Sequence, residues 1–402
     1  MQPITGTPFL IVSAIKIIVI FSTILVLVAL WTLVERRVCA FIQNRLGPNR
    51  VGPQGILQPV ADGLKNIFKE ETLPPFADRG LFVLAPMMAF IPALLTFSVI
   101  PMAAPVPTRW GLVSTAVADL PVGFLFILAI SSLGVYGITL AGWSSNSKYS
   151  LLGGLRASAQ LISYEIAMGL AAVAVLVMAG NITLGEIIAR QQASTWYVFP
   201  LFVAFFVFLV AAFAETNRLP FDLPEAESEL VAGYHTEYSA MKFSMFFIAE
   251  YSNMLTASAL MVTLFFGGWD IPGSWDNSGE PSVLKSVATG AAFWAKTLFF
   301  YFLYIWVRWT LPRFRFDQLM DLGWRFMLPV SFTYVMVIAI AIWGFEAAGL
   351  PFGSRGHTGL LTALNVVLAV LIFWWLDNGR ILGGASARAR RMALRSQLQG
   401  GD

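Results

Sequence analysis

The sequence predicts an all-α protein that crosses a membrane about nine times, and three observations lead to this fold class. First, 57% of the 402 residues are hydrophobic and only 12% are charged, whereas a water-soluble domain carries about 25% charged residues. Second, the apolar residues gather in runs long enough to cross a bilayer, which takes about 20 residues per helix. Third, lysine and arginine accumulate in every other loop between these runs. Most of the surface therefore faces lipid or other protein.

The expected spans cover residues 9–34, 81–104, 113–142, 157–180, 196–214, 241–268, 286–309, 325–347 and 359–377. The first run is too long for a signal-peptide core and ends in Glu35-Arg36-Arg37 rather than at a small-residue cleavage site, so we interpret it as a membrane helix. One set of alternate loops is poor in basic residues and holds only Arg109, Arg190, Lys285 and Arg355. The positive-inside rule then predicts an N-terminus outside and a cytoplasmic C-terminus.

The composition also limits the redox groups that this chain can hold. Its single cysteine, Cys39, excludes an internal disulfide and a multi-thiolate cluster, and His235 and His357 lie outside the expected spans. The sequence has neither of the two common Gly-rich nucleotide-binding motifs. We therefore expect no metal, haem, flavin or iron–sulfur site here. Electrons for any redox reaction would come from a partner.

An unusually acidic stretch occupies the loop at residues 215–240. Its carboxylates are Glu215, Asp222, Glu225, Glu227, Glu229 and Glu237. Crowded like charges beside a membrane raise one another's pKa values and titrate as a set, so the loop could take up protons near neutral pH. The alternative is a solvated surface helix that Asp222 caps, with Glu225 completing a capping box. The pattern does not decide between the two.

Ionisable residues also lie inside the expected spans. Glu165 belongs to the fourth span, Glu250 to the sixth and Lys296 to the seventh. Each such group costs roughly 2.5–3.5 kcal/mol on insertion scales, so these groups usually line a polar or water-filled path. Arg156 and Gln160 share a face of the fourth helix, with Glu165 beside it. Together they indicate a buried proton route, with polar contacts between helices as the alternative.

Residues 43–70 combine a Pro- and Gly-rich turn region with a helical pattern. From about residue 59 to residue 70, apolar residues such as Val60 and Leu64 recur at helical spacing opposite Asp62 and Lys65. This pattern predicts a short amphipathic helix in the plane of the interface. Such a helix could cover a lipid-level pocket for an amphiphilic quinone, or it could be a plain membrane anchor.

A mixture of arginine and aromatic residues follows the seventh span, between residues 308 and 321. It contains Arg313, Arg315 and Asp317. We expect these three residues to dock a partner protein, although lipid headgroup binding and the positive-inside bias are alternatives.

Several motifs together resemble the quinone-site membrane subunit of respiratory complex I, which is the H-subunit family of the NADH-quinone oxidoreductases. They are Glu35-Arg36, G-P-N and L-Q-P-x-A-D-G-x-K within residues 43–65, Ser163-Tyr164-Glu165, A-E-T-N-R-x-P-F-D-L-x-E-x-E-S-E-L-V, F-x-A-E-Y around Glu250, and P-R-F-R-F-D-Q-L-M. The resemblance covers about residues 10–345. Similar subunits occur in energy-converting hydrogenases and formate hydrogenlyases, which provide the alternative function.

The resemblance implies a subunit that joins the peripheral redox arm of a proton-pumping NADH:quinone oxidoreductase to its membrane arm. With peripheral partners it would form a chamber through which ubiquinone or menaquinone reaches the last iron–sulfur cluster, while FMN and the clusters lie in partner subunits. The implied chamber residues are Glu35, Arg36, Arg45, Asp62, Lys65 and Phe221. The implied proton path to adjacent small and antiporter-like subunits contains Arg156, Gln160, Glu165, Glu215, Asp222, Glu225, Glu227, Glu229 and Glu250.

The resemblance further implies a bacterial inner (plasma) membrane location and no nucleic-acid partner. Residues 1–347 would form the eight-helix core, and residues 348–402 an additional helix with a basic tail. His235 departs from the amide or small polar residue expected in the acidic loop, and it could pair with Glu237. Two other classes compete with this function. An ion-coupled transporter would need paired interrupted helices near the midplane, and a non-catalytic scaffold would not need acids within its spans.

Overall fold

The protein is almost entirely helical, as the sequence predicts, in a computed structural model that describes residues 7–108, 111–225, 227–272, 281–350 and 353–377. Within these residues, eight helices are long and apolar enough to cross a membrane. The fifth expected span, residues 196–214, contains a shorter helix. Helix α7 (Phe202–Glu215) has 14 residues, which is about 21 Å of helix at about 1.5 Å per residue, against a hydrocarbon thickness of about 30 Å.

The elements follow the expected order along the chain. The long helices are α1 (Thr7–Ile42), α3 (Arg79–Leu95), α4 (Gly123–Ser144), α5 (Lys148–Ala179), α9 (Ala240–Phe265), α10 (Val283–Thr310), α12 (Leu328–Ala347) and α13 (Arg355–Asp377). The shorter helices besides α7 are α2 (Gln58–Phe68), α6 (Leu184–Ala193), α8 (Glu227–Leu230) and α11 (Phe316–Asp321). Strands β1 (Val106–Thr108) and β2 (Gly111–Val113) pair antiparallel. Single turns lie at Pro53–Gly55, Thr96–Val99 and Gly233–His235, and a π-helical turn (Leu322–Met327) joins α11 to α12.

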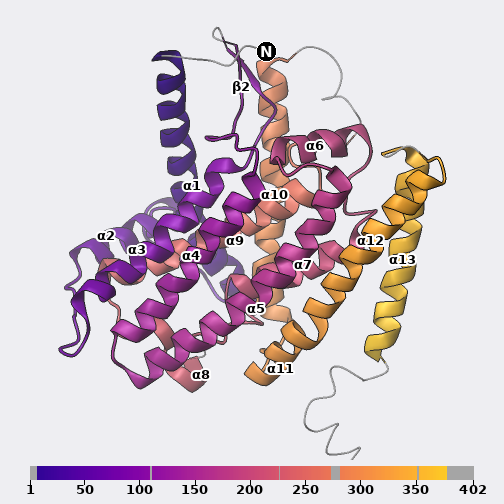
Figure 1. Ribbon diagram of the computed structural model, residues 1–402. Coiled ribbons are helices and arrows are strands. Elements are labelled where there is room, and N and C mark those ends of the chain that lie inside the picture. Colours follow the sequence, from indigo (N-terminus) through magenta and orange to yellow (C-terminus); the bar gives the residue numbers. More distant parts are fainter. Residues whose placement is uncertain (1–6, 109–110, 226, 273–280, 351–352, 378–402) are drawn as a thin grey trace, which may run out of the picture.

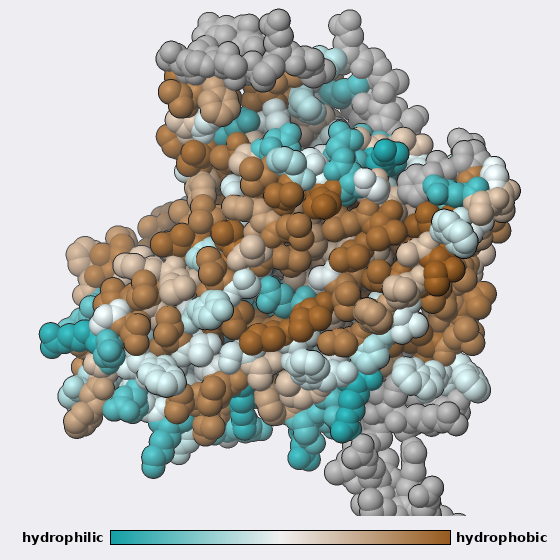
Figure 2. Space-filling view, in the orientation of Figure 1, coloured by the Kyte–Doolittle hydropathy of each residue, from teal (hydrophilic) through white to brown (hydrophobic). Residues whose placement is uncertain are grey.

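The helices form one bundle in which the central members are strongly tilted (Figure 1). The start of α1 and the β1–β2 hairpin lie at one end, and α8 and α11 lie at the other (Figure 1). Figure 2 shows a broad hydrophobic band across the middle of the visible face, with hydrophilic residues gathered toward the two ends. This distribution is typical of a protein that crosses a bilayer several times.

The core is built mainly from α5, α7 and α9, where small residues let the helices approach closely. Ala171, Ala211 and Ala259 are fully buried. On the neighbouring pair α3 and α4, a Cβ added at Gly137 would lie 2.7 Å from the backbone nitrogen of Ala89. Glycine is therefore required at this contact, in keeping with the small residues that membrane helix interfaces favour.

The loop regions at residues 43–70 and 215–240 differ in how well the sequence predicts them. The amphipathic helix expected at residues 59–70 is confirmed as α2, with bounds Gln58–Phe68. The interpretation of Asp222 as a helix cap is wrong, because α8 begins at Glu227 and Asp222 accepts a hydrogen bond from Arg313 instead. The side chains of Phe221 and Leu223 are buried in the core, and they hold this part of the loop in an irregular path.

Candidate functional site

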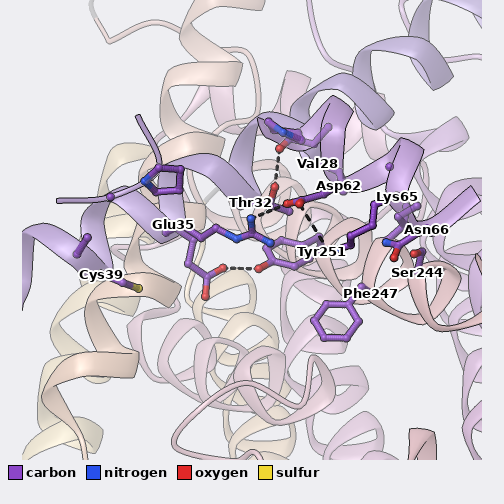
Figure 3. Close-up of a pocket in the computed structure, with 18 of the residues that line it drawn as sticks. Val28, Thr32, Glu35, Cys39, Asp62, Lys65, Asn66, Ser244, Phe247 and Tyr251 are labelled. Atoms are coloured by element: carbon purple, nitrogen blue, oxygen red, sulfur yellow. Dashed lines mark hydrogen bonds and ion pairs between the residues drawn. The ribbon is translucent and has the colours of Figure 1, made fainter. Parts of the chain in front are cut away.

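A large cavity opens between α1, α2 and α9 and the end of α10 (Figure 3). Its volume is about 920 Å³, at the upper end of the range of roughly 300–1,000 Å³ for ligand pockets. Leu25, Val28 and Ala29 of α1 supply an apolar wall, and Glu35 lies further along the same helix. The cavity therefore offers an amphiphilic molecule an apolar region that continues into a charged one.

Five of the six predicted chamber residues line this cavity: Glu35, Arg36, Arg45, Asp62 and Lys65. Arg36 Nη1 donates a hydrogen bond to Asp62 Oδ2 at 2.5 Å, and Lys65 Nζ lies 3.9 Å from Asp62 Oδ1. The first contact joins α1 to α2. The amphipathic helix is thus held over one side of the cavity by a charge pair, while its apolar side chains remain exposed.

The sixth predicted chamber residue, Phe221, lies in the core instead. Its ring stacks on Phe314 with 5.5 Å between the ring centroids, and its backbone oxygen accepts a hydrogen bond from Gln160 Nε2 at 2.9 Å. Gln160 also donates to the backbone oxygen of Ala214 and to Asn217 Oδ1. Gln160 therefore fastens α5 to the end of α7 and to the acidic loop.

Glu35 is the most buried charged group of the large cavity, with 5% of its surface exposed. Its Oε2 accepts a hydrogen bond from the Tyr251 hydroxyl at 2.6 Å (Figure 3). Its Oε1 accepts from Arg218 Nη1 at 3.1 Å and from Arg308. Three donors from three parts of the chain thus converge on this carboxylate, and charge-assisted bonds of this kind are the stronger class.

Arg218 joins Glu35 to a second buried carboxylate. Its Nε lies 2.7 Å from Glu250 Oε1, and its guanidinium lies 4.5 Å from the centre of the Tyr251 ring. Burial opposes the charge of Arg218, but Glu250 and Glu35 outweigh it and raise the pKa of Arg218 well above its usual value. This arginine is therefore a fixed positive charge between two acids.

A second, smaller cavity lies on the Glu250 side of Arg218. Its volume is about 50 Å³, which is room for a few water molecules. Glu165 of α5, Glu215 of α7 and Glu250 of α9 all line it, together with Asn253. Three acids that the sequence places on different helices are thus brought to one polar cavity, where a water-filled site is physically possible.

The acids of the loop have different surroundings. Burial, with the nearby charges of Glu250 and Asp222, raises the pKa of Glu225 well above its usual value although Arg218 opposes this. Glu229 is exposed and accepts a hydrogen bond from Arg156 Nη1 at 2.7 Å. The side chain of Glu227 lies outside the described residues.

The three predicted docking residues divide into two groups. Arg313 Nη2 donates to Asp222 Oδ2 at 3.2 Å, so it ties the segment after α10 to the acidic loop. Arg315 and Asp317 form a pair at 3.3 Å with side chains that are mostly exposed. Arg315 and Asp317 therefore face outward, whereas Arg313 is engaged within the chain.

Arg218, Tyr251 and Arg308 were missed as site residues by the sequence reasoning. A signal existed for Arg218, because it is the one arginine within a run of acids. Tyr251 follows Glu250 directly, but its hydroxyl turns to Glu35 on another helix. Periodicity within one helix cannot reveal such a contact, since 216 positions separate the two residues in the chain.

Comparison with known proteins adds an independent finding. The profile of a family described as NADH dehydrogenase matches residues 15–339. A protein of Leptospira biflexa, named as the H subunit of an NADH-quinone oxidoreductase, is 52% identical over 81% of this chain and 93% of its own length. A Koribacter versatilis protein, named as one of that organism's H subunits of the same enzyme, is 49% identical over 83% of this chain and 98% of its own length. A Rhodothermus marinus protein named NADH-quinone oxidoreductase subunit 8 is 49% identical over 82% of this chain.

Proposed function

This chain belongs to the NADH dehydrogenase family as the H subunit of an NADH-quinone oxidoreductase, and from that premise we propose that it forms the membrane wall of the quinone chamber and the first part of the proton route. The chain is a multi-pass membrane protein. The names of its relatives favour the quinone enzyme over a hydrogenase. Its partners are the peripheral quinone-site subunits and the neighbouring membrane subunits of the complex, in a bacterial inner membrane.

The observation that carries this proposal is the position of Arg218. One of its carboxylate partners, Glu35, lines the large cavity, and the other, Glu250, lines the small one. The two cavities therefore share one buried cation. A change of charge on either side alters the electrostatic energy of the other, because opposite charges at this distance and depth interact strongly.

The large cavity suits a quinone by its chemistry. The apolar wall of α1 accepts an isoprenoid tail, and the polar end near Glu35 and Tyr251 accepts a head group. Reduction of a quinone to a quinol takes two electrons and two protons. The electrons come from NADH through the flavin and iron–sulfur clusters of partner subunits. This chain therefore positions the quinone and supplies protons to it.

The coupling step follows from the shared arginine. When quinone reduction adds negative charge near Glu35, that charge offsets more of the positive charge of Arg218, and the attraction between Arg218 and Glu250 weakens. When negative charge near Glu35 is removed, the attraction strengthens. A weaker attraction favours the protonated form of Glu250, and a stronger attraction favours its carboxylate. Glu250 can exchange protons with Glu215 and Glu165 through water in the small cavity. Quinone chemistry is thereby converted into proton movement toward the neighbouring subunits.

The experiment uses the complex purified through a tag on this chain. We expect flavin, iron–sulfur absorbance and inhibitor-sensitive NADH:quinone turnover to purify with it. A photoreactive quinone should crosslink to the segment of α1 around Glu35, and unlabelled quinone should compete. Glu250→Gln should reduce the protons pumped per NADH while the complex still assembles, whereas Lys285→Gln, in the first turn of α10 and lining neither cavity, should leave pumping unchanged. Hydrogen evolution without quinone turnover, or normal pumping in Glu250→Gln, would contradict the proposal.

A further inference from the structure

His235 lies between the two cavities. Its ring centre is 5.3 Å from that of Phe243 and 6.1 Å from that of Phe247, and both phenylalanines line the large cavity. On another side its ring is 5.0 Å from that of Tyr234, which lines the small cavity. One layer of aromatic side chains thus separates the imidazole from each space.

The nearest acid is Glu225, whose Oε1 lies 3.8 Å from His235 Nδ1. The expected pairing with Glu237 is therefore not the one that the structure has. Hydrogen-bonding distance is about 3.2 Å or less, so a small side-chain rotation closes the contact. Of the other charged groups on the elements packed around His235, Lys242 pairs with Glu71, Arg156 with Glu229, Asp222 with Arg313 and Glu250 with Arg218. Among the described residues, the one ion pair of His235 is with Glu225 and not with Glu237. Glu225 is accordingly the acid with which His235 can exchange a proton.

We propose that His235 passes protons from Glu225 toward the quinone chamber, as a proton-transfer residue that this chain uses during quinone reduction. This inference rests on the proposed function and adds a residue to it. An imidazole suits the position because its two nitrogens can accept a proton on one side and release another on the other.

The charge states of the two groups fit this role. Burial lowers the pKa of His235 to about 4, and it raises that of Glu225 well above its usual value. At neutral pH the resting pair is therefore a carboxylic acid beside a neutral imidazole. In the transfer, the O–H bond of Glu225 breaks as an Nδ1–H bond forms, and the Nε2–H bond breaks as its proton leaves toward the chamber. The imidazole must then return from the Nδ1–H to the Nε2–H form before the next transfer. Reduced quinone accepts that proton, and the acids of the small cavity reprotonate Glu225.

The test is the pH profile of NADH:quinone turnover in the intact complex carrying His235→Asn or His235→Gln. We expect turnover to fall about tenfold or more at pH 8, since a positioned acid–base group contributes about 10²- to 10⁴-fold. The loss should shrink toward pH 6, where protons from solution replace the relay. Glu225→Gln should give the same profile. Imidazole added to His235→Ala should restore turnover, because the small base can take the vacated place.

The control is His357→Asn on α13, which removes the chain's other histidine and should leave the shape of the profile unchanged. NADH oxidation by a water-soluble electron acceptor reports whether each variant is assembled. A pH-independent loss in the His235 variants, together with no rescue by imidazole, would show a purely structural role and overturn the inference. Absence of quinone turnover in the wild-type complex would instead reject the proposed function.

Discussion

Replacing Arg218 with leucine tests whether a single cation holds the two buried acids together. The substitution removes the guanidinium of Arg218, a residue that is 9% exposed, from its place between Glu35 and Glu250. Glu35 keeps the hydrogen bonds from Tyr251 and Arg308. Among the described residues, Glu250 has an ion pair with Arg218 alone. We therefore expect the loss of stability to arise mainly from the uncompensated charge of Glu250.

The size of the effect follows from that geometry. Removing one partner of a buried ion pair costs about 3–5 kcal/mol, because the other charge stays buried and uncompensated. If Glu250 is that charge, the double variant Arg218→Leu with Glu250→Gln should regain about half or more of the stability that Arg218→Leu loses, since the glutamine carries no charge. The double variant should nevertheless fail to pump, because the connection between the cavities is absent from it as well.

The assay is the temperature midpoint at which this chain dissociates from the solubilised complex, measured beside proton pumping in liposomes. The wild type, both single variants and the double variant form one cycle, which isolates the interaction between the two positions. A double variant that is no more stable than Arg218→Leu would refute the reasoning. So would normal pumping in any variant that lacks Arg218.

Three further predictions concern other parts of the chain. Asp62→Asn should change the dissociation midpoint little, because partly exposed ion pairs are worth about 0–1 kcal/mol. It should nevertheless raise the KM for quinone, because it loosens α2 from Arg36. An unchanged KM would show that the position of α2 does not depend on this ion pair. Below pH 6.5 the wild type should lose stability as the pH falls toward the His235 pKa of about 4, since the unfolded chain binds the proton first. His235→Asn should remove up to about 3 kcal/mol of this loss of stability. An unchanged slope of stability against pH in this variant would contradict a buried neutral imidazole. Asn365→Leu should lower the midpoint while turnover remains. It deletes the 2.7 Å bond from Tyr334, which joins α13 to α12, and the bond that Asn365 Nδ2 donates to the backbone oxygen of Pro200, each worth about 0.5–1.5 kcal/mol. An unchanged midpoint would mean that apolar packing alone holds α13.

The sequence predicts the helices well because each apolar run carries its own signal. The span of about 20 residues and the charges that flank it are local properties. The same holds for α2, whose apolar and charged residues alternate at helical spacing within 11 residues. Helix α7 is less predictable at its start. Residues 196–201 continue the same run of apolar and aromatic side chains, but they include Pro200 and the chain forms turns before α7 begins at Phe202.

The site is less predictable because its contacts join distant segments. Glu35 and Arg308 are separated by 273 positions, and no spacing rule relates them. Phe221 illustrates the opposite error, since a residue within a motif implied to line the chamber packs on Phe314 in the core. Motifs identify the neighbourhood of a site. The side chains that face the cavity depend on how the helices cross.

The shared arginine also explains why the acids of this chain cannot be treated one at a time. Glu225 is influenced by Glu250 and Arg218, and Arg218 is in turn held by Glu35. A proton added to any of these carboxylates changes the field at the others, so the set titrates with values that belong to the group. A single neutralising substitution should therefore shift the pH dependence of the whole set. An uncoupled scaffold would show a change at the substituted residue alone, and this difference separates a proton-coupling assembly from polar contacts that merely hold helices together.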